Sequence, residues 1–339
     1  MSVTIKDVAQ KAGVSFATVS RVLRGERYVS AETQQAVHRA VKELGYHPNS
    51  LARNFKTKRS NIIGFVMPDI SNPFFATIAR GIEERARRNG YDLIIYDTHS
   101  DPDRELKGLQ MLAERRVDGV ILSPISDQLL KLEIPDVRIL PVVLVDNLVE
   151  GAEVDSVIID NVQATRRLVE HLLSLGHRKI AMITGPLNQT TGKDRLAGYL
   201  SALHDHGIPE VKGWIREGDF LMQSGYELAG ELLDKADKPT AILAANNFMA
   251  LGAMRAIRER GLHIPRDMAL VAFDDMSEFT TLLDPPLTAM VQPAGRLGDA
   301  ACDLLLRRLH AKRSMKPRQV IMEAELLIRG SCGANAYHD

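Results

Sequence analysis

From Ile62 onward, short apolar segments alternate with amphipathic stretches, and this alternation restricts the possible fold more than any other feature of the chain. Apolar runs of about 4–8 residues predict buried strands, and apolar residues spaced three and four apart predict helices. Strands are expected at residues 62–68, 92–96, 119–122, 142–145, 156–159, 179–184, 240–244, 269–273 and 287–291. Helices are expected at residues 75–88, 103–115, 161–175, 193–205, 224–233, 249–260 and 295–310. The sequence therefore predicts an α/β fold, in which parallel sheets carry helices on both faces.

The alternation runs twice, with an interruption near Asp160. Because a single core rarely grows beyond about 250–300 residues, two doubly wound lobes fit better than one large sheet. The late strand and helix at 287–310, followed by a long strand expected at 318–328, can return the chain to the first lobe. The expected lobes span about residues 61–160 with 292–320, and about 161–291 with 321–330.

The composition is that of an ordinary soluble globular protein and excludes a disordered chain or a coiled-coil filament. The 339 residues include 43 Lys+Arg, 43 Asp+Glu and 45% hydrophobic residues, enough for two or three domains. Cys302 and Cys332 lie far apart without a CxxC motif, so we expect no disulfide framework, no metal site and a reducing cytoplasm. The N-terminus lacks the apolar core of a signal peptide, and no stretch approaches the ~18 apolar residues of a membrane span. We expect a cytoplasmic protein that does not bind membranes.

Charge is distributed unevenly although the net charge is zero. Residues 1–60 hold 11 Lys+Arg and 4 Asp+Glu, a net charge of +7, and the remainder of the chain carries −7. A small basic segment on a larger acidic body indicates a polyanionic partner at one end, although a solvated basic face is the alternative.

Residues 4 to 23 carry the pattern of a helix-turn-helix. Thr4 and Asp7 form a capping box that starts a helix, and Gly13 supplies the left-handed turn that ends it. Ser15 is placed to cap a second helix over residues 16–23. The two helices can pack closely because the residues between them are small or apolar, namely Ala9, Val14 and Val19.

The second of these helices carries the residue types that contact DNA. Thr18 and Ser20 can reach phosphates, whereas Phe16, Ala17 and Arg21 are expected to face base edges in the major groove. The Arg21 guanidinium can donate to O6 and N7 of one guanine, and contact with phosphate alone is the alternative. Double-stranded DNA is therefore the predicted partner.

A third helix, starting at Ser30 and ending at Gly45, has an apolar face that closes the small core. Pro48 and Asn49 can then begin a short helix in which Leu51 and Phe55 share one face. A helix of two turns without its own core is marginal, so we expect it to fold against a partner helix and DNA. A flexible linker is the alternative. The expected divisions are a DNA-binding domain at 1–47, a hinge helix and linker at 48–60, and an effector-binding and dimerisation domain at 61–339.

Polar and aromatic side chains follow the predicted strands, where ligands bind in folds of this class. Aromatic rings, carboxylates and amides together suit a sugar, whose faces stack and whose hydroxyl groups bond to Asp and Asn. Each residue alone can instead be a turn former or a helix cap. The residues in question are Asp69, Asn72, Phe74, Phe75, Ser123, Asp146, Asn147, Lys193, Arg195, Phe220, Asn246, Asp274 and Gln292.

Motifs of enzymes and cofactor sites are missing from the sequence. No GxGxxG follows the first strand, and the Gly185 to Gly192-Lys193 stretch has the wrong spacing for a phosphate-binding loop. HExxH and GxSxG motifs are absent as well. We expect neither an enzyme nor a bound cofactor.

Several segments together resemble the LacI/GalR family of bacterial repressors over essentially the whole chain. They are TIKDVAQKAGVS-ATVSRVL, VSAET, ELGYHPNSLAR, IIGFVMPDISNPFF, VDGVILSP, PVVLVDN, GHRKIAMITGP, RLAGY and VAFDD. Within the family, ITGPLNQTTGKDRLAGY and GWIREGDFLMQSGY are most similar to the ribose and purine repressors. The resemblance implies a homodimer, an N-terminal DNA-binding head, a hinge helix inserted in the minor groove, and a body similar to periplasmic sugar-binding proteins.

Taken with the helix patterns, the resemblance implies a set of DNA-binding residues: Thr4, Ser15, Phe16, Ala17, Thr18, Ser20, Arg21, Asn49, Leu51, Ala52, Arg53, Phe55 and Lys56. Four positions depart from the family's usual pattern. Phe55 stands where Leu is the usual minor-groove wedge, and Lys193 stands where sugar-binding members usually carry Arg. Asn247 replaces Asp, and Asn147 stands where Arg is frequent. Lys193 near Arg195 can select a carboxylate or phosphate on the ligand.

The leading hypothesis is a DNA-binding repressor of a sugar-utilisation operon, controlled by a sugar, sugar acid or sugar phosphate between the lobes. The alternative is a repressor that responds to a nucleobase or nucleoside. A third possibility, a solute-binding module or enzyme sharing the two-lobed body, predicts a signal peptide in place of the basic head, and residues 4–59 contradict it.

Overall fold

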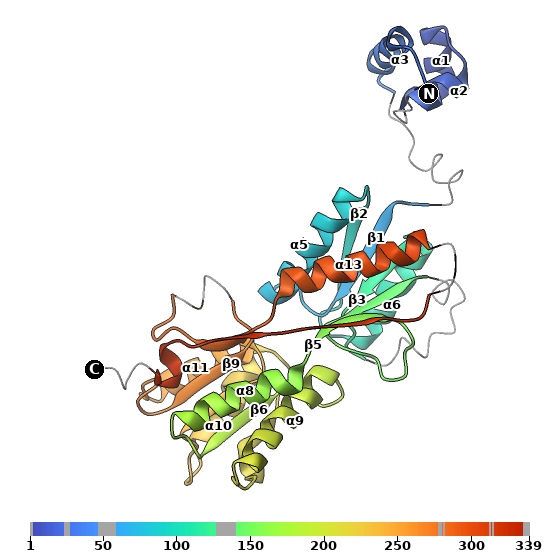
Figure 1. Ribbon diagram of the computed structural model, residues 1–339. Coiled ribbons are helices and arrows are strands. Elements are labelled where there is room, and N and C mark those ends of the chain that lie inside the picture. Colours follow the sequence, from blue (N-terminus) through green and yellow to red (C-terminus); the bar gives the residue numbers. More distant parts are fainter. Residues whose placement is uncertain are drawn as a thin grey trace. The chain divides into compact units, whose positions relative to one another are not determined.

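The computed structural model describes residues 3–23, 28–46, 59–126, 140–276, 280, 282–311, 313 and 315–334. The chain divides into two compact units, Met1–Ser60 and Asn61–Asp339 (Figure 1).

The described part of the first unit, residues 3–23, 28–46 and 59–60, contains the helices α1 (Ile5–Ala12), α2 (Phe16–Leu23) and α3 (Ala31–Leu44). The predicted capping box is present, because the Thr4 hydroxyl accepts from the Asp7 N–H and the Asp7 carboxylate accepts from the Thr4 N–H at 2.7 Å. This backbone donation lowers the pKa of Asp7. Gly13 ends α1 with a φ of 65°, a left-handed conformation that glycine adopts without strain.

A small apolar core joins these helices. It consists of Val8, Ala9, Val19, Val22, Val37 and Ala40, with residues from each helix. The Ser15 hydroxyl accepts from the Thr18 N–H at 3.1 Å at the start of α2, and Ser30 accepts from the Thr33 N–H at the start of α3. The predicted helix-turn-helix and third helix are therefore confirmed.

The second unit contains two six-stranded sheets. The first sheet has the order β11-β5-β4-β3-β1-β2, and all its pairs are parallel. Its strands are β1 (Ile62–Met67), β2 (Asp92–Asp97), β3 (Gly119–Leu122), β4 (Val142–Val145), β5 (Asp155–Ile159) and β11 (Gln319–Met322).

The second sheet has the order β12-β10-β9-β8-β6-β7 and is parallel except for its edge strand β12, which runs antiparallel to β10. Its strands are β6 (Ile180–Thr184), β7 (Ile215–Glu217), β8 (Ala241–Ala244), β9 (Ala269–Phe273), β10 (Thr288–Val291) and β12 (Glu325–Leu327).

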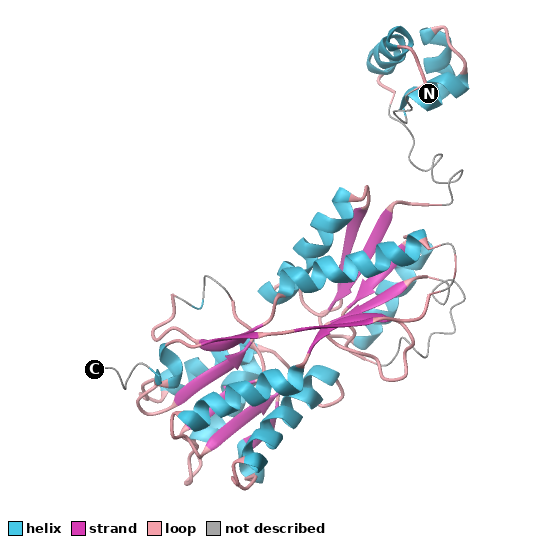
Figure 2. Ribbon diagram, viewed as in Figure 1, coloured by secondary structure: helices cyan, strands magenta, loops and turns pink. Residues whose placement is uncertain are grey.

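Helices cover these sheets on both faces, as Figure 2 shows. The first sheet carries α5 (Pro73–Arg88), α6 (Pro102–Glu114) and α13 (Ala294–His310), and together they form the first lobe. The second sheet carries α8 (Asn161–Ser174), α9 (Thr190–Asp205), α10 (Met222–Leu233) and α11 (Asn247–Glu259), and together they form the second lobe. Short 3-10 helices occur at η2 (Lys212–Trp214) and η3 (Gly330–Cys332).

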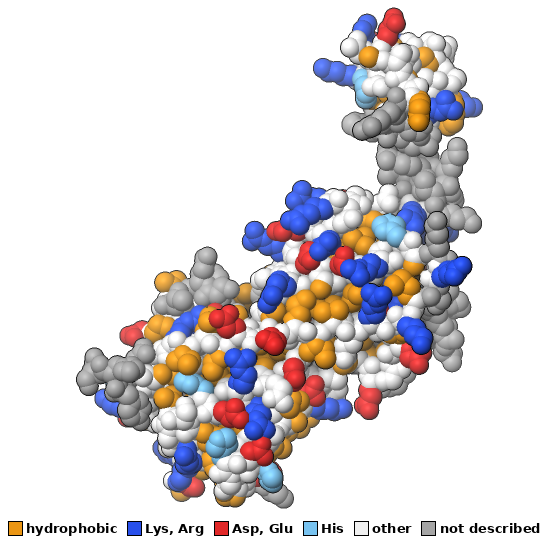
Figure 3. All heavy atoms as spheres, viewed as in Figure 1, with side chains coloured by type: hydrophobic (Ala, Val, Ile, Leu, Met, Phe, Trp, Pro, Cys, Tyr) orange, Lys and Arg blue, Asp and Glu red, His pale blue; other side chains and the backbone are white. Residues whose placement is uncertain are grey.

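Successive side chains of the buried strands point to opposite faces of the first sheet. Phe65 belongs to the larger core, which also contains residues of α5 and α13, whereas Val66 packs with Leu109 and Leu112 of α6. On the surface, basic and acidic side chains are interspersed over the visible face of the second unit (Figure 3).

The structure corrects the sequence prediction at the C-terminal end of the chain. Residues 318–328 form two strands in different sheets, because β11 pairs with β5 and β12 pairs with β10. The strand predicted at 287–291 lies in the second sheet, within the bounds expected for the second lobe, and the helix after it and β11 lie in the first lobe. Strand β7, which is three residues long, had no counterpart in the sequence prediction.

Candidate functional site

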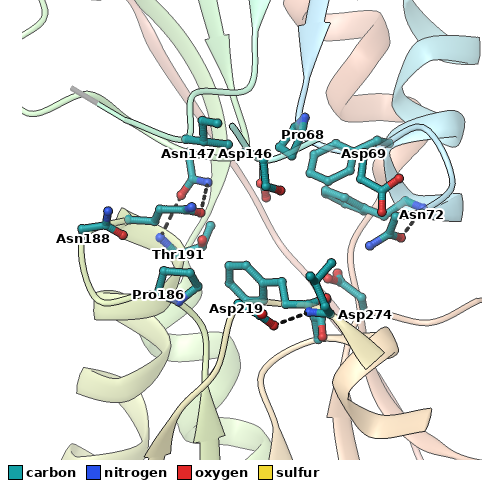
Figure 4. A pocket seen from close by; sticks show the side chains of 18 of the residues that line it. Pro68, Asp69, Asn72, Asp146, Asn147, Pro186, Asn188, Thr191, Asp219 and Asp274 are labelled. Carbon is teal, nitrogen blue, oxygen red and sulfur yellow. Dashed lines mark hydrogen bonds between the residues drawn. The ribbon is translucent and has the colours of Figure 1, made fainter. Parts of the chain in front are cut away.

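A cavity of about 240 Å³ lies between the two lobes, beside the C-terminal ends of strands from both sheets (Figure 4). Of the predicted effector-binding residues, eight line it: Asn72, Phe74, Phe75, Asp146, Arg195, Phe220, Asn246 and Asp274. Asp69 and Asn147 line it too. The topology explains this grouping, since the carboxyl ends of parallel strands meet at one edge of each sheet.

Three of these residues have left-handed backbone conformations. The φ angles are 71° at Asp146, 68° at Phe220 and 67° at Asp274. Such angles are uncommon outside glycine, and for Phe in particular they carry strain that the surroundings must hold. The Asn246 amide holds one of them, because it donates to the Phe220 carbonyl at 2.8 Å while its oxygen caps α11. Strained residues concentrated in one cavity are typical of a binding site.

Arg195 is the fully buried cation of this region, with 2% of its surface exposed. It donates to the Asn161 side chain at 2.9 Å and to the Ala245 carbonyl at 2.6 Å. Its guanidinium stacks on the Phe273 ring at 3.7 Å and lies 3.8 Å from the Asp274 carboxylate. Protein groups therefore already occupy much of its bonding capacity.

The carboxylates of the cavity outnumber this cation. Asp69, Asp146, Asp219 and Asp274 all line the cavity, and among the described residues Arg195 is the one cationic side chain that lines it. Burial raises the pKa of Asp146 to about 7, and the Arg195 charge opposes that rise only in part. Burial also raises the pKa of Asp274. The cavity is thus rich in hydrogen-bond acceptors and unfavourable for an anion.

Aromatic rings come from both lobes. Phe74 and Phe75 of α5 pack edge to face with their centroids 5.1 Å apart, and Phe220 comes from the loop after β7. Asn72 caps α5 by accepting from the Phe74 N–H at 3.0 Å, which places this pair at the cavity.

Three predicted effector-binding residues do not line the cavity. Thr191 and Arg195 are four positions apart on α9 and both line the cavity. Lys193 lies two positions from each of them, so its side chain leaves a different side of the helix and is exposed. The structure therefore does not bring Lys193 into the cavity, and its predicted contact with an anionic group of the ligand stays a prediction. Gln292 is buried behind Asp274, to which its amide donates. Ser123 is buried, and its hydroxyl has no partner among the described residues.

The sequence prediction missed other residues that line the cavity: Pro68, Ser100, Pro102, Ile125, Pro186, Asn188, Gln189, Thr191, Asp219 and Leu221. Most of them follow β1, β2, β3 and β6, so the same reasoning about strand ends finds them once every predicted strand is followed. Asp219 and Leu221 follow β7, the strand that was not predicted.

The candidate DNA-binding residues of the first unit lie at the start of α1 and along α2. Phe16, Ala17 and Arg21 are exposed, whereas Val19 and Val22 are buried in the core. Thr4 and Ser15 are exposed at helix starts, and Thr18 and Ser20 are partly buried. The other predicted residues, Asn49, Leu51, Ala52, Arg53, Phe55 and Lys56, lie outside the described residues.

The described residues contain neither a metal-binding cluster nor a membrane-spanning helix. Across the described parts of the chain, no group of three or more His, Cys, Asp or Glu side chains could hold a metal ion. Within the same residues, no helix has the length and apolar character that crossing a bilayer requires.

Comparison with known proteins identifies both units. Residues 4–49 match the family of bacterial regulatory proteins called lacI, and residues 60–329 match the family of periplasmic binding proteins and sugar-binding domains of LacI regulators. A curated relative, the HTH-type transcriptional repressor PurR of Mannheimia succiniciproducens, is 36% identical over 330 residues, which cover 97% of this chain and 98% of the relative.

Solved structures agree with this assignment. The lac repressor dimer bound to operator and the anti-inducer ONPF has a TM-score of 0.86 at 33% identity, covering 98% of this chain and 99% of that one. The regulator CelR in complex with cellobiose has a TM-score of 0.74 at 32% identity, covering 97% and 99%. The chain belongs to the LacI family of bacterial regulatory proteins and is a DNA-binding transcriptional repressor, not an enzyme.

Proposed function

We propose that this repressor binds a small uncharged sugar between its two lobes and thereby controls a sugar-utilisation operon. The observation that carries the proposal is the excess of carboxylates in the cavity, four Asp against one Arg that is already bonded within the protein. Carboxyl groups accept hydrogen bonds when ionised and also donate one when protonated, so they favour a ligand whose groups both donate and accept, as sugar hydroxyl groups do.

Sugar acids and sugar phosphates fit this cavity less well. Burial already disfavours the charged forms of Asp146 and Asp274, and an anion beside them adds like charge in a buried region, where repulsion is weakly screened and the carboxyl groups would have to stay protonated. Lys193, the residue expected to balance such an anion, is exposed outside the cavity. The cavity volume of about 240 Å³ lies below the roughly 300–1,000 Å³ of sites for drug-sized ligands. A single sugar ring is the size of ligand that we infer.

A nucleobase is the second candidate, because Phe74 and Phe220 approach the cavity from different lobes and can stack on a flat ring. The curated relative named PurR favours this candidate, whereas the CelR complex contains a sugar. We favour the sugar, since a purine base offers few donors to several carboxylates.

On the DNA side, we propose a homodimer that binds a two-fold pseudo-palindromic operator through α2 of each subunit. Its support is the exposed face of Phe16, Ala17 and Arg21, together with the dimeric, operator-bound lac repressor among the similar structures. Acting on DNA, the protein is expected to work in the bacterial cytoplasm.

A thermal-shift screen of the full chain tests the proposed effector class. Neutral monosaccharides, sugar acids, sugar phosphates and nucleobases are compared at equal concentration, because a ligand that binds only the folded protein raises its melting temperature. We expect a shift with a neutral sugar and none with its phosphorylated form. A shift with a nucleobase and none with any sugar contradicts the proposal.

A further inference from the structure

Asn147, in the first lobe, bonds to the start of α9 in the second lobe. Its Nδ2 donates to the Gln189 side-chain oxygen at 3.1 Å, and its Oδ1 accepts from the Thr191 N–H at 3.0 Å. The Thr190 hydroxyl donates to the same Oδ1 at 3.1 Å and accepts from the Leu148 N–H at 2.9 Å. Figure 4 shows Asn147 directed toward this turn.

This contact supplies something that α9 lacks. The first N–H groups of a helix have no partner within the helix and are usually satisfied by the residue before it. Gln189 stands at that position and makes no such bond with its side chain. Asn147, buried with 3% of its surface exposed, provides the cap from the opposite lobe.

A second pair of amides crosses between the lobes at another place. Asn72 donates to the Asn247 oxygen at 3.3 Å, and Asn247 donates to the Asn72 oxygen at 3.1 Å. Both side chains are buried. Backbone groups fix their orientation, since the Phe74 N–H donates to the Asn72 oxygen at 3.0 Å and the Phe248 N–H donates to the Asn247 oxygen at 2.7 Å. Neither amide can rotate without losing one of these bonds.

We propose that Asn147 and the Asn72–Asn247 pair are two latches that hold the lobes closed around the cavity. Asn72 and Asn147 themselves line the cavity, so the latches belong to its walls. Within the described residues, short connections join the lobes from β5 to α8, from β10 to α13 and from β11 to β12. These connections can act as a hinge, and hydrogen bonds between the lobes then bias it toward closure.

The chemical groups of the latches determine how closure of the two lobes responds to salt. Both consist of uncharged amides, hydroxyls and backbone groups, so screening by salt leaves their bonds unchanged. The residues act as positioning residues, because they set the separation of the two walls that a ligand must contact. The proposal concerns hydrogen bonds between the two lobes of one chain. It does not depend on which ligand the repressor binds.

Distances between spin labels across the cleft test the proposal on the full chain without any ligand. Labels are attached at Lys107→Cys on α6 and Ala197→Cys on α9, both exposed positions in different lobes. The native thiols of Cys302 and Cys332 are buried, which directs labelling to the introduced cysteines. The labelled parent is compared with Asn147→Ala/Asn247→Ala and with the milder single variant Asn247→Asp, which keeps the side-chain size and removes one donor.

We expect one distance population in the parent at both low and high salt, and an added population at longer distance in the latch variants. Asn89→Ala is the matched control, because Asn89 donates to the Arg85 carbonyl at 2.8 Å within the first lobe alone. It is expected to keep the parent distance even if its melting temperature falls as far as that of a latch variant. Distances that stay at the parent value in both latch variants, with folding verified by circular dichroism, overturn the proposal.

Discussion

The carboxylates of Asp146 and Asp274 are held in conditions that disfavour their charged forms. Both are buried at the ends of strands, both have left-handed backbones, and one arginine serves both. A buried charge without a full set of partners costs stability, so this arrangement is explained by binding more readily than by folding. At the residue scale, the cavity has the character of a site whose missing donors come from a ligand.

The variant Asp146→Asn tests whether the buried Asp146 carboxylate lowers the stability of the folded protein. The pKa of Asp146 is raised from 3.8 to about 7, so the folded protein holds a proton that the unfolded chain releases between these pH values. The free energy of unfolding of the parent therefore falls as pH rises through this window. The Asp146→Asn variant does not lose this stability, because the Asn side chain does not titrate. Asn also tolerates a φ of 71°. We expect Asp146→Asn to be more stable than the parent at pH 8 and nearly equal to it at pH 4.

Urea unfolding at the two pH values measures the difference. Burial also raises the pKa of Glu105 to about 7, but this group titrates in both proteins and cancels in the comparison. An equal change in stability at pH 4 and pH 8 shows that the Asp146 charge is not the cause.

At the element scale, the strands and helices of the body follow closely from the alternation of apolar runs and amphipathic stretches. Nine predicted strands are present within one or two residues of their expected ends. The same patterns do not reveal β7, because three residues with partial burial leave almost no apolar run. They also do not separate β11 from β12, since the pairing partners of these strands are distant in sequence.

The candidate site was predictable to a similar degree. Residues such as Asp146 and Asp274 were found because they directly follow buried strands. Lys193 was placed in the site because it stands where sugar-binding members of the family usually carry Arg, whereas on α9 it is exposed and does not line the cavity. The bonds of Asn147 to α9 connect different lobes, and no local pattern encodes such a contact.

The packing of α13 on α5 gives a prediction at this scale. A Cβ atom at Gly298 would stand 2.1 Å from the Ile78 carbonyl oxygen, so Gly298→Ala forces the two helix backbones apart. Gly295 lies on the same helix, and a Cβ there meets its nearest atom at 3.9 Å. Overpacking typically costs about 1–3 kcal/mol, and we expect that loss for Gly298→Ala.

Gly295→Ala serves as the matched control for this comparison. Gly295 stands in the first turn of α13, where the gain from alanine is small, so Gly295→Ala should leave the urea midpoint unchanged or slightly raised while Gly298→Ala lowers it. Equal effects of the two substitutions contradict the close approach of α5 and α13.

At the scale of the whole molecule, a DNA-binding unit and a ligand-binding unit lie on one chain, and the proposed function requires that they communicate. A ligand can shift an equilibrium only by its difference in affinity for two states. The two lobes of the second unit provide such states if the angle between them changes on binding. A typical coupling of ~1–3 kcal/mol changes operator occupancy by about 5- to 150-fold.

Arg21→Ala tests how the first unit reads DNA. Exposed on α2, Arg21 is expected to contact one guanine in each half-site, and its loss should cost ~1–3 kcal/mol per half-site. Selection from a random DNA library with the parent and the variant measures the preference at every position. Relaxed selectivity at one base pair of each half-site is the expected outcome, whereas an equal loss on all sequences assigns Arg21 to phosphate contact.

The central claim is that a ligand in the cavity between the lobes controls operator binding. The most direct measurement is the operator affinity of the parent and of Asp274→Ala, by fluorescence anisotropy with and without the sugar identified in the thermal-shift screen. Asp274 lies in the cavity and outside the DNA-binding unit. The account predicts that the sugar changes the parent's operator affinity about 5- to 150-fold, and that Asp274→Ala binds operator like the parent without responding to the sugar. A response in Asp274→Ala equal to that of the parent contradicts the account and places the effector elsewhere.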